Sequence, residues 1–313
     1  MADQLADLRI LVPLDGSDLA TVSLPFVRAL ADEASEVVLL RVVQDDTPLI
    51  AVYADGNRVE QLLERNRQAA NHYLEHVAAI LSNETGHLTL RTDVGMPHTA
   101  ILRAAREEHV DLIVIATRGR GFLGRAMVGS VADRVARTSP VPVLLIHPHE
   151  HDVPARPQEI GNVRRIIVPL DGSELANQAM PVAERFARLL GIPILLLRAI
   201  DLQGEWVLGE DDMESFLEPM REDLAEELHR EARSLTDAGV PTSIDLGVGP
   251  VTKVIRDAIE PGDLIVMTSH GAGGLRRWLL GSVADKLLRS GVAPVMLVPV
   301  AERATMAEPY AKA

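Results

Sequence analysis

The stretch RILVPLDGSDLA, residues 9–20, returns almost unchanged as RIIVPLDGSELA at residues 165–176. In each copy a short run of branched apolar residues is followed by Asp-Gly-Ser and then by a helical stretch. An apolar run of this length, bounded by a turn signal, is typical of a buried parallel strand. The stretch therefore predicts a strand, a tight turn and a helix, twice in one chain.

Two further blocks recur in the same order. DLIVIATRGRG at residues 111–121 matches DLIVMTSHGAG at 263–273, and the halves close with VPVLLIHP and APVMLVPV. The separation is 156 residues for the first block and 152 for the second. An internal duplication explains this order better than chance does, and each half has the usual size of one domain.

Within a half, apolar runs alternate with longer helical segments. In the first half this pattern predicts strands at residues 9–14, 37–43, 87–94, 112–117 and 143–147, and helices at 16–34, 58–81, 98–108 and 130–138. Strands separated by helices of this length indicate βαβ units and a parallel sheet. We therefore expect an α/β fold with five strands per half, and Pro25 and Pro181 in a first helical turn or at a kink.

The prolines and mixed charges of HPHEHDVPARPQEIGN, residues 147–162, indicate a linker between the halves. We expect a first domain at residues 1–148, a linker at 149–162, a second domain at 163–300 and a tail at 301–313. A terminal tail of this kind is expected to be poorly ordered or loosely docked.

Composition narrows the class of protein. The chain has 313 residues and a formal net charge of -14, which disfavours DNA or RNA as a partner because phosphate backbones repel such a surface. It has no cysteine, so disulfides and thiolate chemistry are excluded. The acidic start MADQLADLRI is unlike a signal peptide, and no apolar run is long enough to span a bilayer. We expect a soluble cytoplasmic protein without membrane partners.

A glycine-rich stretch, RGRGFLGRAMVGSVADR at 118–134, has the same layout as HGAGGLRRWLLGSVADK at 270–286. Each copy leaves an expected strand and enters an expected helix, with the spacing G-x9-G-S. Glycine lets the backbone approach a ligand, and a helix start presents unpaired N–H groups to phosphate. Positive charge is supplied by Arg118, Arg120 and Arg125 in one half, and by Arg276 and Arg277 in the other. The pattern predicts a phosphate site in each half.

The sequence also bears on the start of each helix and on the type of phosphate-binding motif. Ser130 with Asp133, and Ser282 with Asp285, have the S-x-x-D spacing of a capping box at the helix start. The Walker A pattern is absent, and we treat the single G-x-G-x-x-G at residues 119–124 as accidental because it does not open the helix directly.

The aspartate of PLDGS, Asp15 or Asp171, follows the first strand of each half beside the same crevice. A carboxylate there can accept hydrogen bonds from ribose hydroxyls. It can equally cap its own turn or the following helix. Duplication does not separate the two roles, because a duplicated turn would also repeat.

With these residues in view, each half resembles a universal stress protein domain, and residues 9–300 resemble a tandem member of that family. The nucleotide-binding branch carries G-x2-G-x9-G-[ST], and Gly119, Gly129 and Ser130 match it, as do Gly271, Gly281 and Ser282. The first glycine of the pattern is replaced by Ala116 in one half and by Thr268 in the other, where a β-branched side chain would narrow the pocket.

The resemblance implies one ATP site per half, with Mg²⁺ as an accompanying ion. It implies two flavodoxin-like or Rossmann-like domains, each a five-stranded parallel sheet of order 3-2-1-4-5 flanked by helices. Family members pair through their last strands, so the halves of a tandem chain can pair internally, and a homodimer of tandem chains is a further option. The residues implied for nucleotide binding are Pro13, Asp15, Val42, Ala116, Gly119, Arg120, Gly129, Ser130 and Val131, then Pro169, Asp171, Ala199, Thr268, Gly271, Ala272, Gly281, Ser282 and Val283.

No catalytic or metal-binding constellation is predicted. His98 has Pro250 as its counterpart at a separation of 152, so a base needed in both halves is not preserved. His147, His149 and His151 alternate at the start of the linker, but the second half lacks them and a surface linker explains them. Trp206 and Phe216 lie in residues 201–219, where they could cover the nucleotide pocket or meet a partner. A loop packed on its own domain is the expected alternative.

The sequence therefore favours an ATP-binding stress-response or regulatory protein with one adenine-nucleotide site per domain. The first alternative is a slow ATPase using the same phosphate sites, although no residue is identified to position the water. The second is an interaction scaffold that binds no nucleotide.

Overall fold

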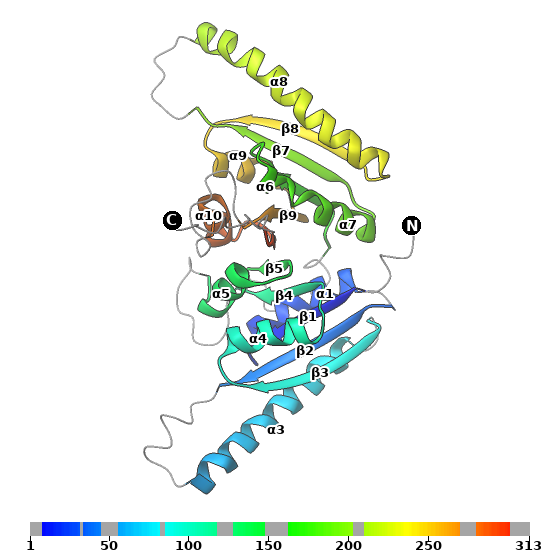
Figure 1. The fold of residues 1–313 in the computed structure, drawn as a ribbon, viewed down its shortest axis with the longest axis vertical. Helices are drawn as coiled ribbons and strands as arrows, with labels where there is room; N and C mark the ends of the chain where they lie inside the picture. Colours follow the sequence, from blue (N-terminus) through cyan, green and yellow to red (C-terminus); the bar gives the residue numbers. More distant parts are fainter. Residues whose placement is uncertain are drawn as a thin grey trace, which may run out of the picture.

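The computed structural model describes residues 8–31, 34–44, 56–81, 85–117, 128–147, 162–202, 210–269 and 280–300, without the side chains of residues 56–59 and 210–214. In these residues the strands join into one ten-stranded sheet that runs the length of the molecule (Figure 1). The linker at 149–161 and the tail at 301–313 lie outside the described residues.

The two halves contain corresponding elements. The first half consists of β1 (Arg9–Leu14), the 3-10 helix η1 (Asp18–Ser23), α1 (Leu24–Leu30), β2 (Glu36–Val43), α3 (Gly56–Leu81), β3 (His87–Val94), α4 (Pro97–Glu107), β4 (Leu112–Ala116), α5 (Ser130–Thr138) and β5 (Val143–Ile146). The second half consists of β6 (Arg165–Pro169), α6 (Glu174–Asn177), α7 (Met180–Leu190), β7 (Ile194–Ile200), α8 (Glu210–Asp237), β8 (Thr242–Val248), α9 (Val251–Ala258), β9 (Asp263–Thr268), α10 (Ser282–Ser290) and β10 (Val295–Val298).

The strand order is β3-β2-β1-β4-β5-β10-β9-β6-β7-β8. The strands of each half are parallel and follow the order 3-2-1-4-5, so the expected fold is confirmed. The halves meet where β5 pairs with β10 in antiparallel orientation, with Leu144 opposite Met296. The last strands of the two halves therefore pair within one chain, as the resemblance implied.

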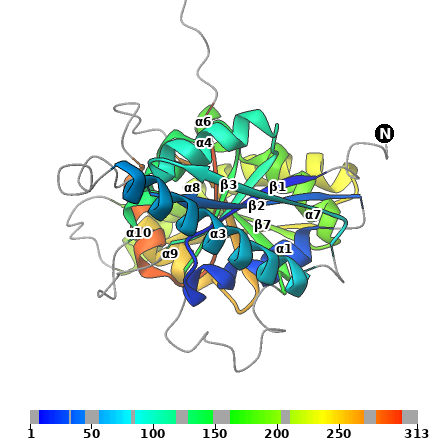
Figure 2. The same cartoon turned by 90° about the horizontal axis from the view of Figure 1, so that it is seen from below.

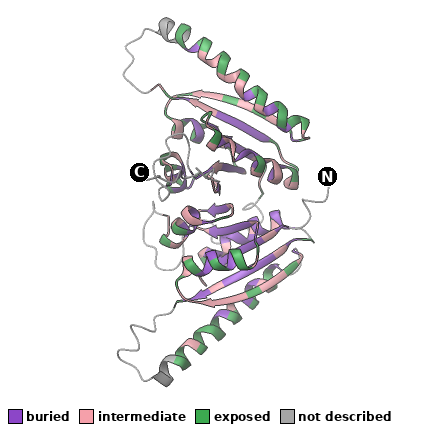
Figure 3. Cartoon of the chain, viewed as in Figure 1, coloured by how far each residue is buried: buried purple, intermediate pink, exposed green. Residues whose placement is uncertain are grey.

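Two apolar clusters cover the two faces of the sheet. Ile10 and Val12 face the cluster that includes α1, α3, α7 and α8, whereas Leu11 faces the cluster that includes α4, α5, α9 and α10. Neighbouring residues of one strand thus contribute to opposite faces, and burial on both faces explains why the inner strands are nearly continuous apolar runs (Figure 3). The edge strands β3 and β8 are more exposed and more polar. Helix α3 packs on β2 and β3, as Figure 2 shows from below.

The first helix of each half differs from the prediction. A single helix was expected over residues 16–34, but the chain forms η1 and then α1, with Pro25 in the first turn of α1. The second half likewise forms α6 and then α7, with Pro181 in the first turn. Proline has no backbone N–H and clashes with the preceding turn, so it is tolerated where a new helix begins.

Helix α8 corrects a second prediction. Residues 201–219 were expected to form a loop, but α8 begins at Glu210 and contains Pro219. Phe216 lies on this helix with 41% of its surface exposed, and Trp206 lies outside the described residues. Since α8 extends over 28 residues, the helix and not a loop forms this side of the second half.

Candidate functional site

The first strand of each half ends in an Asp-Gly-Ser turn that the aspartate closes. The Asp15 Oδ1 atom accepts hydrogen bonds from the Ser17 backbone N–H at 2.9 Å and from the Ser17 hydroxyl at 2.5 Å. Asp171 makes the same two bonds to Ser173, at 2.9 and 2.5 Å. Gly16 supplies the left-handed conformation that the turn needs, with φ of 77°. Of the two roles expected for the aspartate, the turn-capping role is confirmed.

The serine of the turn then caps the helix that follows. The Ser17 hydroxyl accepts a hydrogen bond from the Ala20 N–H at 3.3 Å, and the Ser173 hydroxyl accepts one from the Ala176 N–H at 3.1 Å. Successive hydrogen bonds of the aspartate and the serine therefore hold the backbone at the carboxyl ends of β1 and β6. This is the edge at which open parallel sheets bind ligands.

Backbone hydrogen bonds also hold the residue just after β4 or β9 to the glycine that precedes the next helix. The Gly129 N–H donates to the Thr117 carbonyl at 2.6 Å, and the Gly281 N–H donates to the Ser269 carbonyl at 2.8 Å. A Cβ atom added to Gly129 would lie 2.9 Å from the Thr117 carbonyl oxygen. Glycine is therefore required by the fold at this position, whatever the site binds.

The predicted capping boxes are wrong. Gly129 and Gly281 occupy the N-cap positions, and neither helix start has a side-chain cap. Ser130 is instead the first helical residue, while the Asp133 carboxylate pairs with Arg137 at 2.9 and 2.7 Å. A serine cannot move one residue back to the cap, because its Cβ would meet the Thr117 carbonyl.

The start of α5 still has the properties of an anion site. Ser130 is exposed, and the first helical N–H groups have no partner within the helix. Val131 and Val283 are half-buried and pack against the apolar cluster of that face, so their side chains belong to the core. Ser282 is exposed at the start of α10 in the same way as Ser130.

The carboxyl ends of β2 and β7 supply the next part of the crevice. Val42 is 8% exposed and belongs to the apolar cluster, whereas Ala199, its counterpart, is half-buried. Pro13 is buried and pairs in register with Leu40. In the second half Pro169 is half-buried.

The residues that replace the first motif glycine differ in exposure. Ala116 is half-buried at the end of β4, and Thr268 is 5% exposed at the end of β9. The methyl group and hydroxyl of Thr268 are therefore largely enclosed by the protein.

The second half contains a pocket of about 360 Å³ at the carboxyl ends of β6 and β7. It brings together Asp171 and Ala199 of the predicted site, and it is closed on two sides by residues of α8 and α9. The lining residues are Leu170, Asp171, Arg198, Ala199, Ile200, Asp201, Leu202, Met220, Leu224 and Val251. Pro169, Thr268, Gly281, Ser282 and Val283 are not among them.

Sequence reasoning missed Met220 and Leu224, the contribution of α8 to this pocket. Their spacing of four residues places them on one face of a helix, which is a usable signal once residues 210–219 are recognised as helical. It also missed Arg198, although LLR occurs at 39–41 and again at 196–198. The Arg198 guanidinium donates to Glu227 Oε2 at 2.7 Å and to the Asp171 carbonyl at 3.4 Å, while Arg41 donates to the Leu14 carbonyl at 3.2 Å.

Part of the predicted site lies outside the described residues. This applies to Gly119, Arg120, Gly271 and Ala272, and to the cations Arg118, Arg125, Arg276 and Arg277. His149 and His151 also lie outside them, and His147 Nδ1 lies 3.0 Å from the Thr117 hydroxyl. Within the described ranges, no group of three or more His, Asp or Glu side chains is arranged to hold a metal ion.

The counterpart of His98 also needs correction. Gly95 and Gly249 have matching φ values of 134° and 130°, and each lies two residues before the first residue of α4 or α9, so the separation here is 154 residues. His98 therefore corresponds to Thr252 and not to Pro250. Threonine does not titrate as a base in this range, so the argument against a shared histidine base is unchanged.

None of the helices in the described part of the chain combines the length and apolarity needed to cross a membrane. Together, the fold and the strand-end turns define a tandem, doubly wound α/β protein with candidate ligand sites at the carboxyl edge of its sheet. The model of the universal stress protein family matches residues 8–147 and again 162–299. The chain belongs to the universal stress protein family, with two domains in tandem.

Relatives with the same tandem length support this assignment. A universal stress protein of Mycolicibacterium smegmatis is 26% identical over 311 residues, which cover 95% of this chain and 99% of the relative. One of Mycobacterium tuberculosis is 26% identical over 326 residues, covering 96% and 98%. Among solved structures, a universal stress protein of Archaeoglobus fulgidus has a TM-score of 0.63 at 19% identity and covers 93% of this chain and 98% of its own. That structure shows a likeness of fold.

Proposed function

We propose that this protein binds adenine nucleotides, with one ATP site in each domain, and acts in stress adaptation through nucleotide-dependent conformational change or partner binding. The observation that carries the proposal is the pocket at the carboxyl ends of β6 and β7, which contains the predicted residues Asp171 and Ala199. This is the position at which doubly wound sheets bind nucleotides.

The pocket has a suitable size and chemistry for the nucleoside part of ATP. Its volume of about 360 Å³ lies within the range of small-molecule sites, and most of its lining is apolar. Leu170, Met220 and Leu224 offer surfaces for a flat purine, and the backbone at Ala199 would read the edge of the base. Asp171 and Asp201 are exposed at the pocket and would accept hydrogen bonds from ribose hydroxyls.

The phosphates would extend toward the start of α10, where Gly281 and Ser282 present backbone N–H groups and the positive end of the helix dipole. In the first half Asp15, Val42, Gly129 and Ser130 occupy the corresponding elements. The arginines of the two loops would add positive charge to the phosphate ends. When bound, ATP supplies the charge and the phosphoanhydride bonds, and this chain's residues orient it and hold its base away from water.

Several finer points remain predictions. They are an accompanying Mg²⁺ ion, a homodimer of tandem chains, a cytoplasmic location and slow ATP hydrolysis. The last is tested by a turnover assay on freshly purified protein, compared with a variant that no longer binds ATP. Phosphate release that persists in such a variant would indicate contamination.

The proposal is tested by Ser130→Asp and Ser282→Asp, measured by equilibrium dialysis with ATP. Each residue is exposed at the first helical position, where a negative charge favours the helix dipole by about 0.3–1 kcal/mol and repels phosphate. We expect wild type to bind two ATP molecules per chain, each single variant one, and the double variant none. Substitution of Gly129 is a poorer test, because any Cβ there disturbs the fold.

Ser234→Asp is the matched control, because Ser234 is exposed on α8 and lies more than two helical turns from Met220 and Leu224. It adds the same charge and should leave both sites intact. Absence of binding by wild type at millimolar ATP would refute the proposal and favour an interaction scaffold.

A further inference from the structure

The second pocket is lined by an arginine whose positive charge is already paired with a carboxylate. The Arg198 side chain is 15% exposed and lines the pocket. One guanidinium nitrogen donates to Glu227 Oε2 at 2.7 Å, and another lies 3.4 Å from the Asp171 carbonyl oxygen. Glu227 comes from α8 and does not itself line the pocket. The ion pair therefore joins Arg198, which lines the pocket, to α8, the helix that contributes other lining residues.

The first half has the arginine but a different residue in place of the glutamate. Leu74 and Leu81 of α3 are fully buried, and Leu228 and Leu235 of α8 are buried at a constant separation of 154 residues. In that register Tyr73 of α3 corresponds to Glu227 of α8. The two domains therefore differ chemically at this position, with a carboxylate in the second and a phenol in the first.

Charge at the second pocket depends on the pair of Arg198 with Glu227. The ionisable residues that line the second pocket are Asp171, Arg198 and Asp201. Because Glu227 holds Arg198, an anionic group placed here meets two carboxylates and a cation whose charge is already paired. A free arginine beside a ribose is the usual means of accepting a ribose phosphate, and a carboxylate is the usual means of binding the free hydroxyl.

We propose that Glu227 is a specificity-determining residue, which makes the second pocket reject nucleotides that carry a phosphate on the 2′ or 3′ oxygen of the ribose. The inference rests on the proposed function, because it assumes that the ribose of a nucleotide lies beside Asp171.

The test uses two isomers of the same composition, ADP and adenosine 2′,5′-bisphosphate. Binding is measured by titration calorimetry in the full chain carrying Ser130→Asp, which leaves the second site to be observed. Glu227→Gln keeps the shape of the side chain and releases the guanidinium. We expect the affinity for the 2′,5′-bisphosphate, relative to ADP, to rise at least tenfold in this variant.

Two further variants show whether the effect acts through Arg198. Glu226→Gln removes the same charge from an exposed neighbouring residue of α8 and should leave the ratio of affinities unchanged. Adding Arg198→Met to Glu227→Gln should abolish the gain, because the gain requires the guanidinium.

The outcomes separate this inference from the proposed function. If wild type binds neither ADP nor ATP, the proposed function fails and this inference fails with it. If ADP binds and Glu227→Gln changes the ratio less than twofold, nucleotide binding stands and the role of Glu227 is refuted. A gain that survives Arg198→Met would also refute it, since the guanidinium would then not be the phosphate partner.

Discussion

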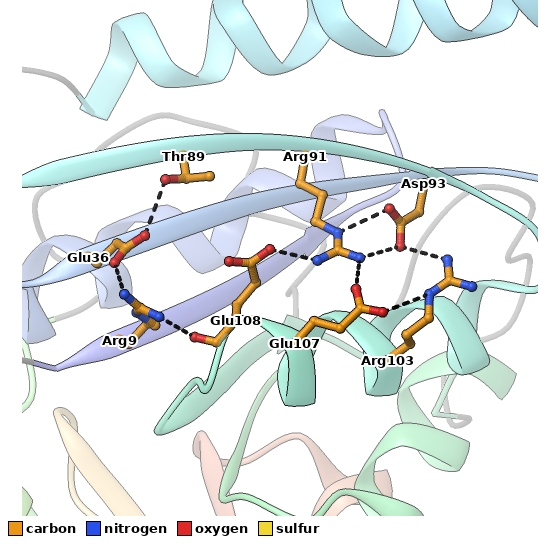
Figure 4. Close-up of polar contacts among 8 residues, drawn as sticks. All are labelled: Arg9, Glu36, Thr89, Arg91, Asp93, Arg103, Glu107 and Glu108. Atoms are coloured by element: carbon orange, nitrogen blue, oxygen red, sulfur yellow. Dashed lines mark hydrogen bonds and ion pairs between the residues drawn. The ribbon is translucent and has the colours of Figure 1, made fainter.

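The two domains share their strand order and strand-end turns, but they attach the outermost strand to its neighbouring helix by different interactions. In the first domain Arg91 of β3 pairs with Asp93 at 3.0 Å and with Glu108, the residue that follows α4, at 2.6 Å, and it also contacts Glu107 of α4 (Figure 4). Arg103 of α4 reaches Asp93 at 2.9 Å. Ionic groups thus connect β3 to α4.

In the second domain the position of Asp93 is occupied by Gly247, and the contact is apolar. A Cβ on Gly247 would lie 2.3 Å from Val254 Cγ1 of α9, so the Val254 side chain packs directly over the glycine backbone. Arg91 has Asp245 as its counterpart at the separation of 154 residues, so the cation is absent as well. The comparison shows that one position in a duplicated fold can be satisfied by a partly buried ion network or by close packing, and that the residues change as a set.

The largest effect is expected where the domains meet and are most alike. Leu144 and Met296 are fully buried, face each other in register and occupy corresponding positions of β5 and β10. Replacing either by alanine should lower the free energy of unfolding by about 2–5 kcal/mol, through lost burial and a residual cavity. Urea denaturation measures the change. Effects that differ by more than about twofold between the two substitutions would show that β5 and β10 contribute unequally to the stability of their pairing.

A smaller effect is expected from placing the first domain's residue in the second. Gly247→Asp adds a Cβ that overlaps Val254 and a carboxylate without the two arginines that Asp93 has. We expect a loss of about 2–3 kcal/mol, which combines overpacking with a partly buried unpaired charge. Ser243→Asp, on an exposed position of the same strand, is the control and should change stability little. If Gly247→Asp leaves the free energy of unfolding unchanged, α9 can move away from β8 at low cost.

Most of the fold follows from the sequence, because the buried inner strands require apolar runs and the duplication repeats these runs in the second half. The site is less predictable from the sequence. The capping boxes at Ser130 and Ser282 follow a local rule, but a carbonyl beyond the loop, that of Thr117, decides that glycine takes the cap. Local rules cannot include a contact made after the chain returns on itself.

The pocket shows the same limit. Asp171 and Ala199 were predicted as nucleotide-binding residues, but Leu224 comes from α8, whose first ten residues were expected to form a loop. The ion pair of Arg198 with Glu227 joins residues 29 positions apart. A strand-end motif locates the candidate ligand-binding edge of the sheet, whereas the residues that shape the pocket come from packing between elements.

The ion network of the first domain should make its stability depend on pH. Burial opposes ionisation of Asp93, but hydrogen bonds and charge from Arg91 and Arg103 outweigh it, and the pKa of Asp93 is lowered. A lowered pKa in the folded state adds stability above the unfolded pKa of about 3.9, and this stability is lost as pH falls through the folded value. The Asp93 hydrogen bond in turn raises the pKa of Arg91, which stays charged throughout.

Asp93→Asn should therefore lower the free energy of unfolding by about 1–2 kcal/mol at pH 7, with the difference shrinking as pH falls below about 4. Urea denaturation at pH 7, 5 and 3 measures it. A difference that stays constant over this range would show that Asp93 acts through shape or neutral hydrogen bonding and not through its charge.

The smallest effect is expected from an ion pair on α9, the helix that corresponds to α4. Lys253 and Asp257 lie 2.6 Å apart but are 71% and 62% exposed, and the pair stays within its own helix. Arg103 of α4 instead reaches across to Asp93, which is only 11% exposed. Exposed pairs at this spacing contribute about 0.3–0.5 kcal/mol, so Lys253→Gln should lower the free energy of unfolding less than Arg103→Gln does.

Salt should separate the two substitutions further. In 1 M NaCl the loss of stability in Lys253→Gln should disappear, while that in Arg103→Gln should persist in part, because salt screens an exposed pair more than one beside a buried carboxylate. Equal costs for the two substitutions, or equal screening, would contradict the view that burial of the acidic partner sets the strength of these pairs.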